Sequence, residues 1–491
     1  MVPIRQQQKL VYTGQVNIFK IMKFIPISKE ILEQIIAITG ERTFYNKEDL
    51  ERFSHDETED LVFYPEVVTL PESTEEVSAL VKLCDKHQIP ITPRGAGTGL
   101  SGGALAIHGG LVICMEKMNK IIDIDERNLQ ATVEPGVITE NLIDAVGDKN
   151  LLYPVDPASK GSCFIGGNVA HGSGGPQVVK YGTIREYILN LEVVLPSGEI
   201  IWTGANTLKF SSGYNLTQLM IGSEGTLGIV TKIVVKLIPK PKENILMLAS
   251  FKSNEAACQA VSRIFMAGQT PSSLEFMERK GVEWVIKYDQ IAFTLVDGIE
   301  AFLLIEVNGD SMDDLFMQCE QINIVLEEND CQDVLLADSS AQKEALWNMR
   351  RTMAVSVKSN SVYKEEDTVV PRAELPKLIK GIKEIGNRYG FESVCYGHAG
   401  DGNLHVNIIK GGMNDEDWNH KLGDGIKEIF ELTVSLGGTL SGEHGIGYVQ
   451  KDYMPIKFSP VHIALMQGIK TVFDPKGIMN PGKMFNPPAN A

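Results

Sequence analysis

The stretch that decides the fold is Pro93-Arg94-Gly95-Ala96-Gly97-Thr98-Gly99-Leu100-Ser101-Gly102-Gly103, which follows a predicted strand at 89–92. A loop this rich in glycine lets successive backbone N–H groups converge on an anion, because no Cβ atom blocks close approach. A pyrophosphate is the natural ligand of such a loop. Residues 97, 99 and 102 match the GxGxxG pattern, but residues 104–115 are strand-like and lack the helix that a Rossmann site requires. The sequence therefore disfavours NAD binding of that type.

Two other interpretations of this loop carry less weight. Residues 99–103 match the GxSxG nucleophile elbow of hydrolases, but that motif also needs a strand-turn-helix setting. A purely structural glycine turn is the second alternative. Further glycine loops at 165–168, 172–175 and 222–228 all precede residue 240. One long ligand lying between several loops explains them together, whereas isolated turns would need a separate reason each time.

Helix and strand patterns alternate on both sides of a predicted domain boundary near Lys240, which predicts an α+β fold with two α+β domains. Apolar residues recur at helical spacing in 73–88, after the capping residues Ser73 and Thr74. The first domain is expected to hold a second helix at 139–146 and strands at 66–70, 89–92, 111–115, 131–133, 188–195, 199–203 and 228–237. The second is expected to hold strands at 245–251 and 301–307 and helices at 254–266, 311–328 and 340–358.

Length, charge and cysteine usage narrow the class of protein. The 491 residues exceed what one hydrophobic core usually organises, and the net charge of −17 would repel nucleic acid and anionic lipid. No run approaches the roughly 20 apolar residues that a membrane-spanning helix needs. The seven cysteines never form a CxxC pair, which is typical of reduced thiols and excludes a four-cysteine iron–sulfur cluster. We expect a cytoplasmic protein with no nucleic-acid partner and no membrane insertion.

The first 21 residues contain basic residues but no acid, and they lack the long apolar core of a secretory signal. Met22 begins a second plausible start of the protein. A weak targeting peptide is conceivable, but we expect residues 1–21 to be a disordered or mis-started N-terminal extension.

Three histidines and a carboxylate lie in two glycine-rich segments. His398 and His405 are seven residues apart across a glycine turn, and Glu443 and His444 follow in a second glycine-rich loop. A reversing turn could bring the first two imidazoles together. Two imidazoles and one carboxylate with open positions form a catalytic divalent-metal site. The alternative is a hydrogen-bonded histidine cluster without metal.

The order of these motifs resembles the vanillyl-alcohol oxidase and p-cresol methylhydroxylase superfamily of FAD proteins, from about Tyr64 to the C-terminus. The segments 156–159, 180–182 and 213–215 are similar to those of its 2-hydroxyacid dehydrogenase branch, which includes the glycolate oxidase catalytic subunit, D-lactate dehydrogenase and D-2-hydroxyglutarate dehydrogenase. The resemblance implies a two-part FAD-binding domain of the p-cresol methylhydroxylase type at 22–240. It also implies an α+β substrate (cap) domain with the metal site at 241–459, and a C-terminal segment at 460–491 that returns to the FAD domain.

The resemblance also implies which residues bind FAD, with the first loop holding its pyrophosphate. The expected cofactor-binding residues are Pro93, Arg94, Gly95, Ala96, Gly97, Thr98, Gly99, Ser101, Gly102, Pro157, Ala158, Gly166, Gly167, Asn168, Tyr181, Gly182, Glu224, Gly228 and Ile229. Some members of the superfamily attach the flavin covalently through a His or Cys. None of the nine histidines lies within 93–103, so we expect FAD to be held non-covalently.

By the same resemblance His398, His405 and Glu443 bind the metal, either Zn²⁺ or Mn²⁺, and His444 is the catalytic base. Asn407 is expected to touch the substrate. An imidazole suits removal of the hydroxyl proton at neutral pH. A metal on the hydroxyl and carboxylate oxygens would lower the hydroxyl pKa and orient the Cα hydrogen for transfer as hydride to flavin N5.

The substrate carboxylate needs a cation, and the segment 346–351 resembles the family helix whose Arg binds it in a fork geometry. Arg350 is the expected residue, and Lys364, one residue short of the family spacing, is expected as a second cation. Ala354 stands where D-2-hydroxyglutarate dehydrogenases carry Thr, so D-lactate or glycolate is favoured as substrate over D-2-hydroxyglutarate.

Two further functions stay open at this point. The first is an oxygen-using oxidase of the same superfamily, and the second is a non-catalytic subunit that binds only partners. For a dehydrogenase we expect an external electron acceptor, with an iron–sulfur subunit or an electron-transfer flavoprotein among the candidates, and a homodimer is possible.

Overall fold

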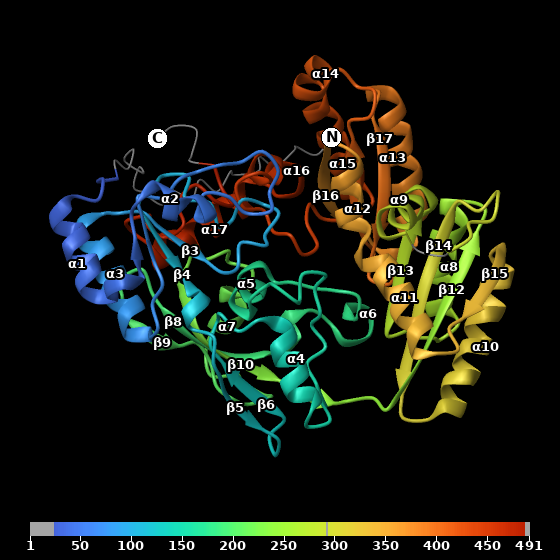
Figure 1. The fold of residues 1–491 in the computed structure, drawn as a ribbon, viewed down its shortest axis with the longest axis horizontal. Helices are drawn as coiled ribbons and strands as arrows, with labels where there is room; N and C mark the ends of the chain where they lie inside the picture. Colours follow the sequence, from blue (N-terminus) through green and yellow to red (C-terminus); the bar gives the residue numbers. More distant parts are fainter. Residues whose placement is uncertain (1–23, 291–292, 487–491) are drawn as a thin grey trace, which may run out of the picture.

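The computed structural model describes residues 24–290 and 293–486, so the predicted N-terminal extension at 1–21 lies outside the described residues. The chain forms two lobes, coloured blue to green and yellow to orange in Figure 1, and the red C-terminal segment lies beside the first lobe. We call residues 24–240 the first lobe and residues 241–459 the second lobe. Among residues 24–290 and 293–486, no helix combines the length and apolar character needed to cross a membrane.

The first lobe holds two main sheets, in keeping with the expected two-part architecture. The smaller sheet has the order β1 (Thr43–Phe44), β2 (Val67–Thr69), β4 (Leu111–Cys114) and β3 (Ile91–Arg94). The larger is antiparallel, in the order β5 (Ile121–Asp125), β6 (Gln130–Val133), β10 (Ile229–Lys236), β8 (Ile188–Val194) and β9 (Ile200–Trp202). Helices α1 (Lys29–Thr39) and α3 (Thr74–His87) share a core with the smaller sheet, and Ser73 caps α3 as the sequence predicts.

The first lobe also holds four short helices: α4 (Thr139–Gly147), α5 (Ile165–His171), α6 (Val178–Tyr181) and α7 (Leu216–Met220). The expectation of a glycine loop at 165–168 is wrong, because these residues form the first turn of α5. Gly166 serves close packing instead. A Cβ on Gly166 would lie 2.5 Å from the Cβ of Pro135, so the helix can approach that segment only with glycine at this position.

The second lobe is built on one antiparallel seven-stranded sheet. Its order is β15 (Cys331–Leu336), β12 (Glu243–Phe251), β14 (Ala301–Gly309), β13 (Ser273–Glu278), β17 (Glu392–Gly397), β18 (Asn403–Ile409) and β16 (Tyr363–Val369). One face packs on α8 (Asn254–Met266), α10 (Met312–Glu328), α13 (Leu375–Tyr389) and α15 (Leu422–Ser435). The opposite face packs on α9 (Arg279–Asp289), α11 (Ser340–Arg351) and α12 (Met353–Asn360). The single helix expected at 340–358 is therefore two helices, since the backbone turns at Thr352 (φ −77°, ψ −6°).

The C-terminal segment leaves α17 (Pro460–Phe473) and packs on the first lobe. Ile91 donates its N–H to the carbonyl of Ile478, and the buried Lys483 ammonium donates to the carbonyls of Gly102 and Leu105. The chain passes between lobes after β11 (Ile238–Pro239). These contacts support the domain limits at 240 and 460, which we propose on this basis.

Candidate active site

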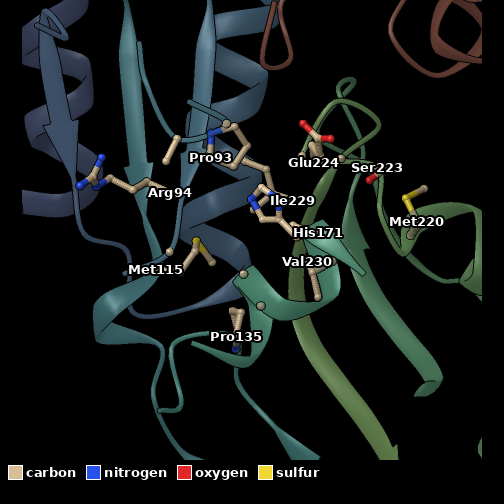
Figure 2. Close-up of a pocket in the computed structure, with 18 residues that line it drawn as sticks. Pro93, Arg94, Met115, Pro135, His171, Met220, Ser223, Glu224, Ile229 and Val230 are labelled. Carbon is tan, nitrogen blue, oxygen red and sulfur yellow. The ribbon is translucent and has the colours of Figure 1, made fainter. Parts of the chain in front are cut away.

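A cleft of about 720 Å³, counted with its open mouth, lies in the first lobe where the ends of β3 and β10 meet α5 (Figure 2). Its lining is rich in glycine, so backbone rather than side chains shapes much of the wall. The lining residues are Pro93, Arg94, Gly95, Gly103, Ala104, Met115, Pro135, Gly166, Gly167, Ala170, His171, Met220, Ser223, Glu224, Gly225, Gly228, Ile229 and Val230. Such a wall lets a flat or phosphorylated ligand approach main-chain N–H groups closely.

The sequence-predicted FAD residues divide into two groups. Those that line the cleft are Pro93, Arg94, Gly95, Gly166, Gly167, Glu224, Gly228 and Ile229. Those outside its lining are Ala96, Gly97, Thr98, Gly99, Ser101, Gly102, Pro157, Ala158, Asn168, Tyr181 and Gly182. The guanidinium of Arg94 points away from His171 in Figure 2 and donates to the carbonyl of His55, so its charge braces a neighbouring loop.

The cleft adjoins the loop that carries His444. His171, at the end of α5, lines the cleft, and its Nδ1 lies 2.9 Å from the carbonyl oxygen of His444. The Ser101 hydroxyl donates to the same carbonyl over 3.0 Å. Glu224 accepts from the backbone N–H groups of Ile446 and Gly447, each over 2.7 Å. Sequence reasoning missed His171, although it closely follows the Gly166-Gly167-Asn168 motif that it did single out.

His398 and His405 are brought together by the β17–β18 hairpin. His405 lies in β18 opposite Tyr396 of β17, while His398 directly follows β17, and the two imidazole centroids are 5.5 Å apart. The connecting turn depends on Gly402, whose φ is +88° and whose added Cβ would lie 1.9 Å from the carbonyl oxygen of Val370. A side chain there would displace the turn that spaces the histidines.

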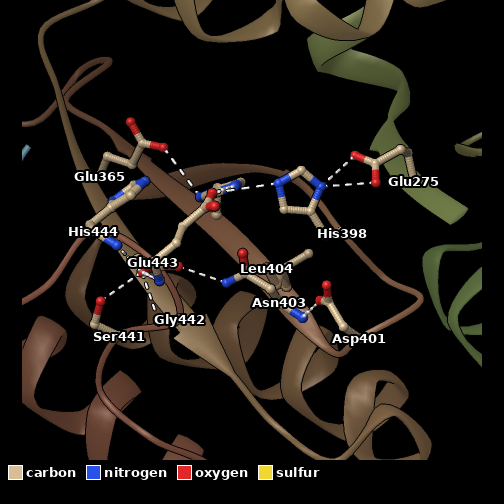
Figure 3. Close-up of polar contacts among 12 residues, drawn as sticks. Glu275, Glu365, His398, Asp401, Asn403, Leu404, Ser441, Gly442, Glu443 and His444 are labelled. Carbon is tan, nitrogen blue, oxygen red and sulfur yellow. Dashed lines mark hydrogen bonds and ion pairs between the residues drawn. The ribbon is translucent and has the colours of Figure 1, made fainter. Parts of the chain in front are cut away.

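Glu443 completes a group of three possible metal ligands. Its Oε1 lies 3.5 Å from Nε2 of His398 and 3.5 Å from Nε2 of His405, and all three ligand atoms lie within 4.8 Å of one another (Figure 3). Metal–ligand bonds of about 2.0–2.2 Å in tetrahedral geometry separate the ligand atoms by roughly 3.3–3.6 Å. The carboxylate-to-imidazole distances therefore fit a divalent ion.

The protonation states of this trio suit cation binding. Burial would raise the pKa of Glu443, but the hydrogen bond and charge of His398 lower it to about 2. Burial and the charge of His444 lower the pKa of His405 to about 3, which leaves that imidazole neutral. Burial would lower the pKa of His398, but the charge of Glu275 raises it well above the ordinary value for histidine. A metal ion would therefore displace one proton from His398.

Glu275 of β13 is a fully buried carboxylate that sequence reasoning missed. Its two oxygens accept from Nδ1 of His398, each over 2.9 Å, so that the opposite ring nitrogen faces Glu443. It also pairs with Arg350 over 2.7 Å. The sequence did hold a signal, because a charged residue flanked by Leu274 and Phe276 in a buried strand needs a specific partner.

Asp367 of β16 holds the second glycine-rich loop in place and was also missed. Its Oδ2 accepts from the backbone N–H groups of Gly442, Glu443 and His444 over 2.7, 2.8 and 2.9 Å. Although burial alone would raise the pKa of Asp367, the charge of His444 and the backbone hydrogen bonds from His444 and Glu443 lower it strongly. The carboxylate thereby fixes the direction of both Glu443 and His444.

Several buried polar atoms around the trio have no hydrogen-bond partner within the described residues. They are Nε of Arg350, the hydroxyl of Tyr396, both amide atoms of Asn407 and Nδ1 of His405. The Arg350 guanidinium lies 5.1 Å from the Tyr396 ring centroid, and the His444 ring stacks on His405 at 5.1 Å. Buried polar groups are almost always paired, so this concentration indicates the position of a small polar ligand.

Lys364 is not brought to this position. In the β16–β18 pairing Glu365 lies opposite Asn407, whereas Lys364 lies opposite Ile408. Because strand side chains alternate between faces, Glu365 shares the face of Asn407, and Lys364 is on the other face of the sheet. The Glu365 carboxylate lies 3.6 Å from Nδ1 of His405. The spacing of Lys364 in the sequence is one residue short of the family pattern. The anion Glu365 therefore lies where the cation Lys364 was expected.

Comparison with known proteins agrees with this two-lobe organisation. Residues 65–204 match the FAD binding domain family, and residues 240–484 match the family described as FAD linked oxidases, C-terminal domain. The solved structure of p-cresol methylhydroxylase with substrate bound superposes with a TM-score of 0.76 at 18% identity, over 92% of this chain and 96% of that one. That likeness concerns the fold.

The sequence relatives are closer. The chain is 39% identical to the glycolate oxidase subunit GlcD of Bacillus subtilis, over 94% of this chain and 97% of the relative. It is 38% identical to D-lactate dehydrogenase of Anaerostipes hadrus, over 93% and 98% of the two chains. It is 32% identical to D-2-hydroxyglutarate dehydrogenase of Stutzerimonas stutzeri, over 89% and 95%. The chain therefore belongs to the family of FAD-linked oxidoreductases that join an FAD-binding domain to the C-terminal domain of FAD-linked oxidases.

Proposed function

We propose that this protein oxidises a small 2-hydroxyacid, D-lactate or glycolate, to the corresponding 2-oxoacid. The observation that carries the proposal is the cluster of unpartnered polar atoms on Arg350, Tyr396 and Asn407 beside the His398, His405 and Glu443 trio. A short acid with adjacent hydroxyl and carboxylate groups supplies the partners that these atoms lack. The names of the three relatives, all of which concern 2-hydroxyacids or their oxidation, point the same way.

The residues divide the chemistry between them. Arg350 offers its free Nε–H to the substrate carboxylate, and Asn407 can donate to one substrate oxygen while accepting from another. In its neutral form His444 can take the hydroxyl proton on a ring nitrogen, and its stacking on His405 places it beside the trio. Bound FAD supplies the hydride acceptor, and the glycine-lined cleft next to His444 is the proposed place for it.

The metal proposal rests on the donor set. His398, His405 and Glu443 would hold Zn²⁺ or Mn²⁺, which supplies Lewis acidity toward the substrate hydroxyl. Glu275 orients His398 for this role, an arrangement common around metal-binding imidazoles. We propose that FAD is held non-covalently and that its electrons pass to an external acceptor, with an iron–sulfur partner and an electron-transfer flavoprotein among the candidates.

The direct test is anaerobic mixing of the purified flavoprotein with D-lactate, glycolate, L-lactate, a sugar or a phenol. Loss of the flavin absorption band with D-lactate or glycolate, within the time of one turnover, is the expected result. The enantiomer L-lactate is the matched control, because it has the same charge and size but presents its Cα hydrogen in the opposite direction. A flavin that stays oxidised with every 2-hydroxyacid, while a sugar or phenol bleaches it, would contradict the proposal.

A further inference from the structure

A carboxylate, Glu365, occupies the face of β16 that looks toward the proposed substrate position. It is the register partner of Asn407 on the neighbouring antiparallel strand, and cross-strand partners have Cβ atoms roughly 4.5–5.5 Å apart on one face. Only 8% of the Glu365 side chain is exposed, and Asn407 is fully buried with both amide atoms unpartnered. Any substrate group that reaches beyond Asn407 on this side therefore meets a buried carboxylate.

Among the described residues, no lysine or arginine forms an ion pair with Glu365. Arg350 is already paired with Glu275 over 2.7 Å, and Lys358 with Glu57 over 2.7 Å. Lys364 lies on the opposite face of the sheet. Within residues 24–290 and 293–486, the charged contact of Glu365 is with the imidazole Nδ1 of His405, at 3.6 Å.

We propose that Glu365 is a specificity-determining residue that rejects 2-hydroxyacids carrying a second carboxylate and restricts the site to those with an uncharged side chain. The inference rests on the proposed function, since it assigns the substrate class of the same site. It places D-2-hydroxyglutarate and D-malate among the poor substrates and D-lactate among the good ones.

Electrostatics sets the size of the effect. Two like charges about 5 Å apart, at an effective dielectric constant of about 20, lose on the order of 10²-fold in affinity. Glu365→Gln removes the charge with little change of shape, and Glu365→Lys reverses it. The ratio of kcat/KM for D-lactate to that for D-2-hydroxyglutarate should fall by about 10² in the first variant and further in the second.

The experiment measures that ratio in the FAD-loaded native protein, in both Glu365 variants and in Glu366→Gln. Glu366 is a buried carboxylate on the same strand whose side chain faces the other way, toward Gln450, so its variant should keep the native ratio. Binding of pyruvate and 2-oxoglutarate, followed by the shift of flavin absorption, gives a second readout that needs no turnover. In both Glu365 variants, the ratio of the affinity for pyruvate to the affinity for 2-oxoglutarate should fall together with the ratio of kcat/KM.

Two outcomes would overturn the inference. One is an unchanged ratio in both Glu365 variants. The other is loss of bound metal from Glu365→Gln, because Glu365, His405 and His444 also offer ligand atoms within 4.8 Å of one another and the residue would then be a ligand. Failure of the proposed function looks different, since no 2-hydroxyacid would then bleach the native flavin. The ratio of the affinities for pyruvate and 2-oxoglutarate, compared between the native protein and the Glu365 variants, would still decide the role of Glu365.

Discussion

The cleft of the first lobe and the histidine cluster of the second lobe are both framed by glycine-rich segments, but they present different chemistry. The cleft is shaped largely by backbone, and even Arg94 turns its charge away from it. The cluster instead gathers side chains from β13, β16, β18 and the 441–444 loop. The difference suggests that the first region holds a cofactor by shape and main-chain donors, whereas the second carries the reaction.

The largest effect is expected from His405→Ala. Loss of this imidazole should release the metal and lower turnover by at least about 10³-fold, since a Lewis acid contributes several kcal/mol to such reactions. The flavin spectrum should stay unchanged, because the cleft is untouched. Elemental analysis and steady-state assays measure both properties, and chelation of the native protein should reproduce the loss. His462→Ala, an exposed histidine on α17, is the matched control. Full activity without stoichiometric metal would contradict the assignment.

His444→Ala should separate the base from the ligands. Removal of a general base typically costs about 10² to 10⁴ in rate, so reduction of the flavin by D-lactate should slow to that extent. Metal and FAD should both remain, because Glu443 and the cleft are intact. Rapid-mixing absorption measurements give the rate. A variant that loses its metal would make His444 a ligand, and one that bleaches at the native rate would remove it from the mechanism.

A smaller effect is expected from Glu275→Gln. The substitution removes the charge that orients the imidazole of His398 through Nδ1. Loss of the hydrogen-bond partner of a metal-binding histidine weakens metal binding by about 10- to 100-fold. Competition with a chelator of known affinity measures this directly. Glu278→Gln is the control on the same strand, because Glu278 pairs with Lys383 instead. Equal metal affinity in the two variants would show that Glu275 does not position the ligand.

A fourth prediction addresses the cleft through Gly167. A Cβ added there meets nothing within 4 Å and Ala is the better helix former, so Gly167→Ala should not lower the thermal stability of the FAD-free protein. If FAD lies against this wall, the same methyl group should weaken FAD binding by about tenfold, in line with the modest cost of overpacking. Gly412→Ala also adds a Cβ to open space but lies outside the cleft lining. Equal FAD affinity in the two variants would move the cofactor elsewhere.

The smallest effect concerns the attachment of FAD. Acid precipitation of the native protein should leave a colourless pellet and release all flavin into solution. His171 is the histidine that lines the cleft, so His171→Ala should give the same result as the native protein. Yellow colour that stays with the native pellet and disappears with His171→Ala would show a covalent bond at that residue.

The sequence predicted local features well and distant contacts poorly, for a physical reason. The helix at 254–266 has the expected limits, since its cap and apolar spacing lie within one stretch of chain. The approach of His398 to His405 also followed from a local turn. Glu275 contacts His398 across 123 residues, and Asp367 contacts Glu443 across 76, so no spacing rule could reveal either. Lys364 shows the same limit at short range, because one residue of strand register reverses the face of a side chain.

The contacts of the 441–447 loop bear on how the substrate enters and leaves. Asp367 binds the start of this loop from the second lobe, while Glu224, only 5% exposed, binds Ile446 and Gly447 from the first lobe. A hinge motion that parted the lobes would exchange these two hydrogen bonds for bonds to water, at a net cost of about 1.5–3 kcal/mol each because the acceptor is charged. We therefore expect the acid and its product to exchange while the lobes remain closed on one another.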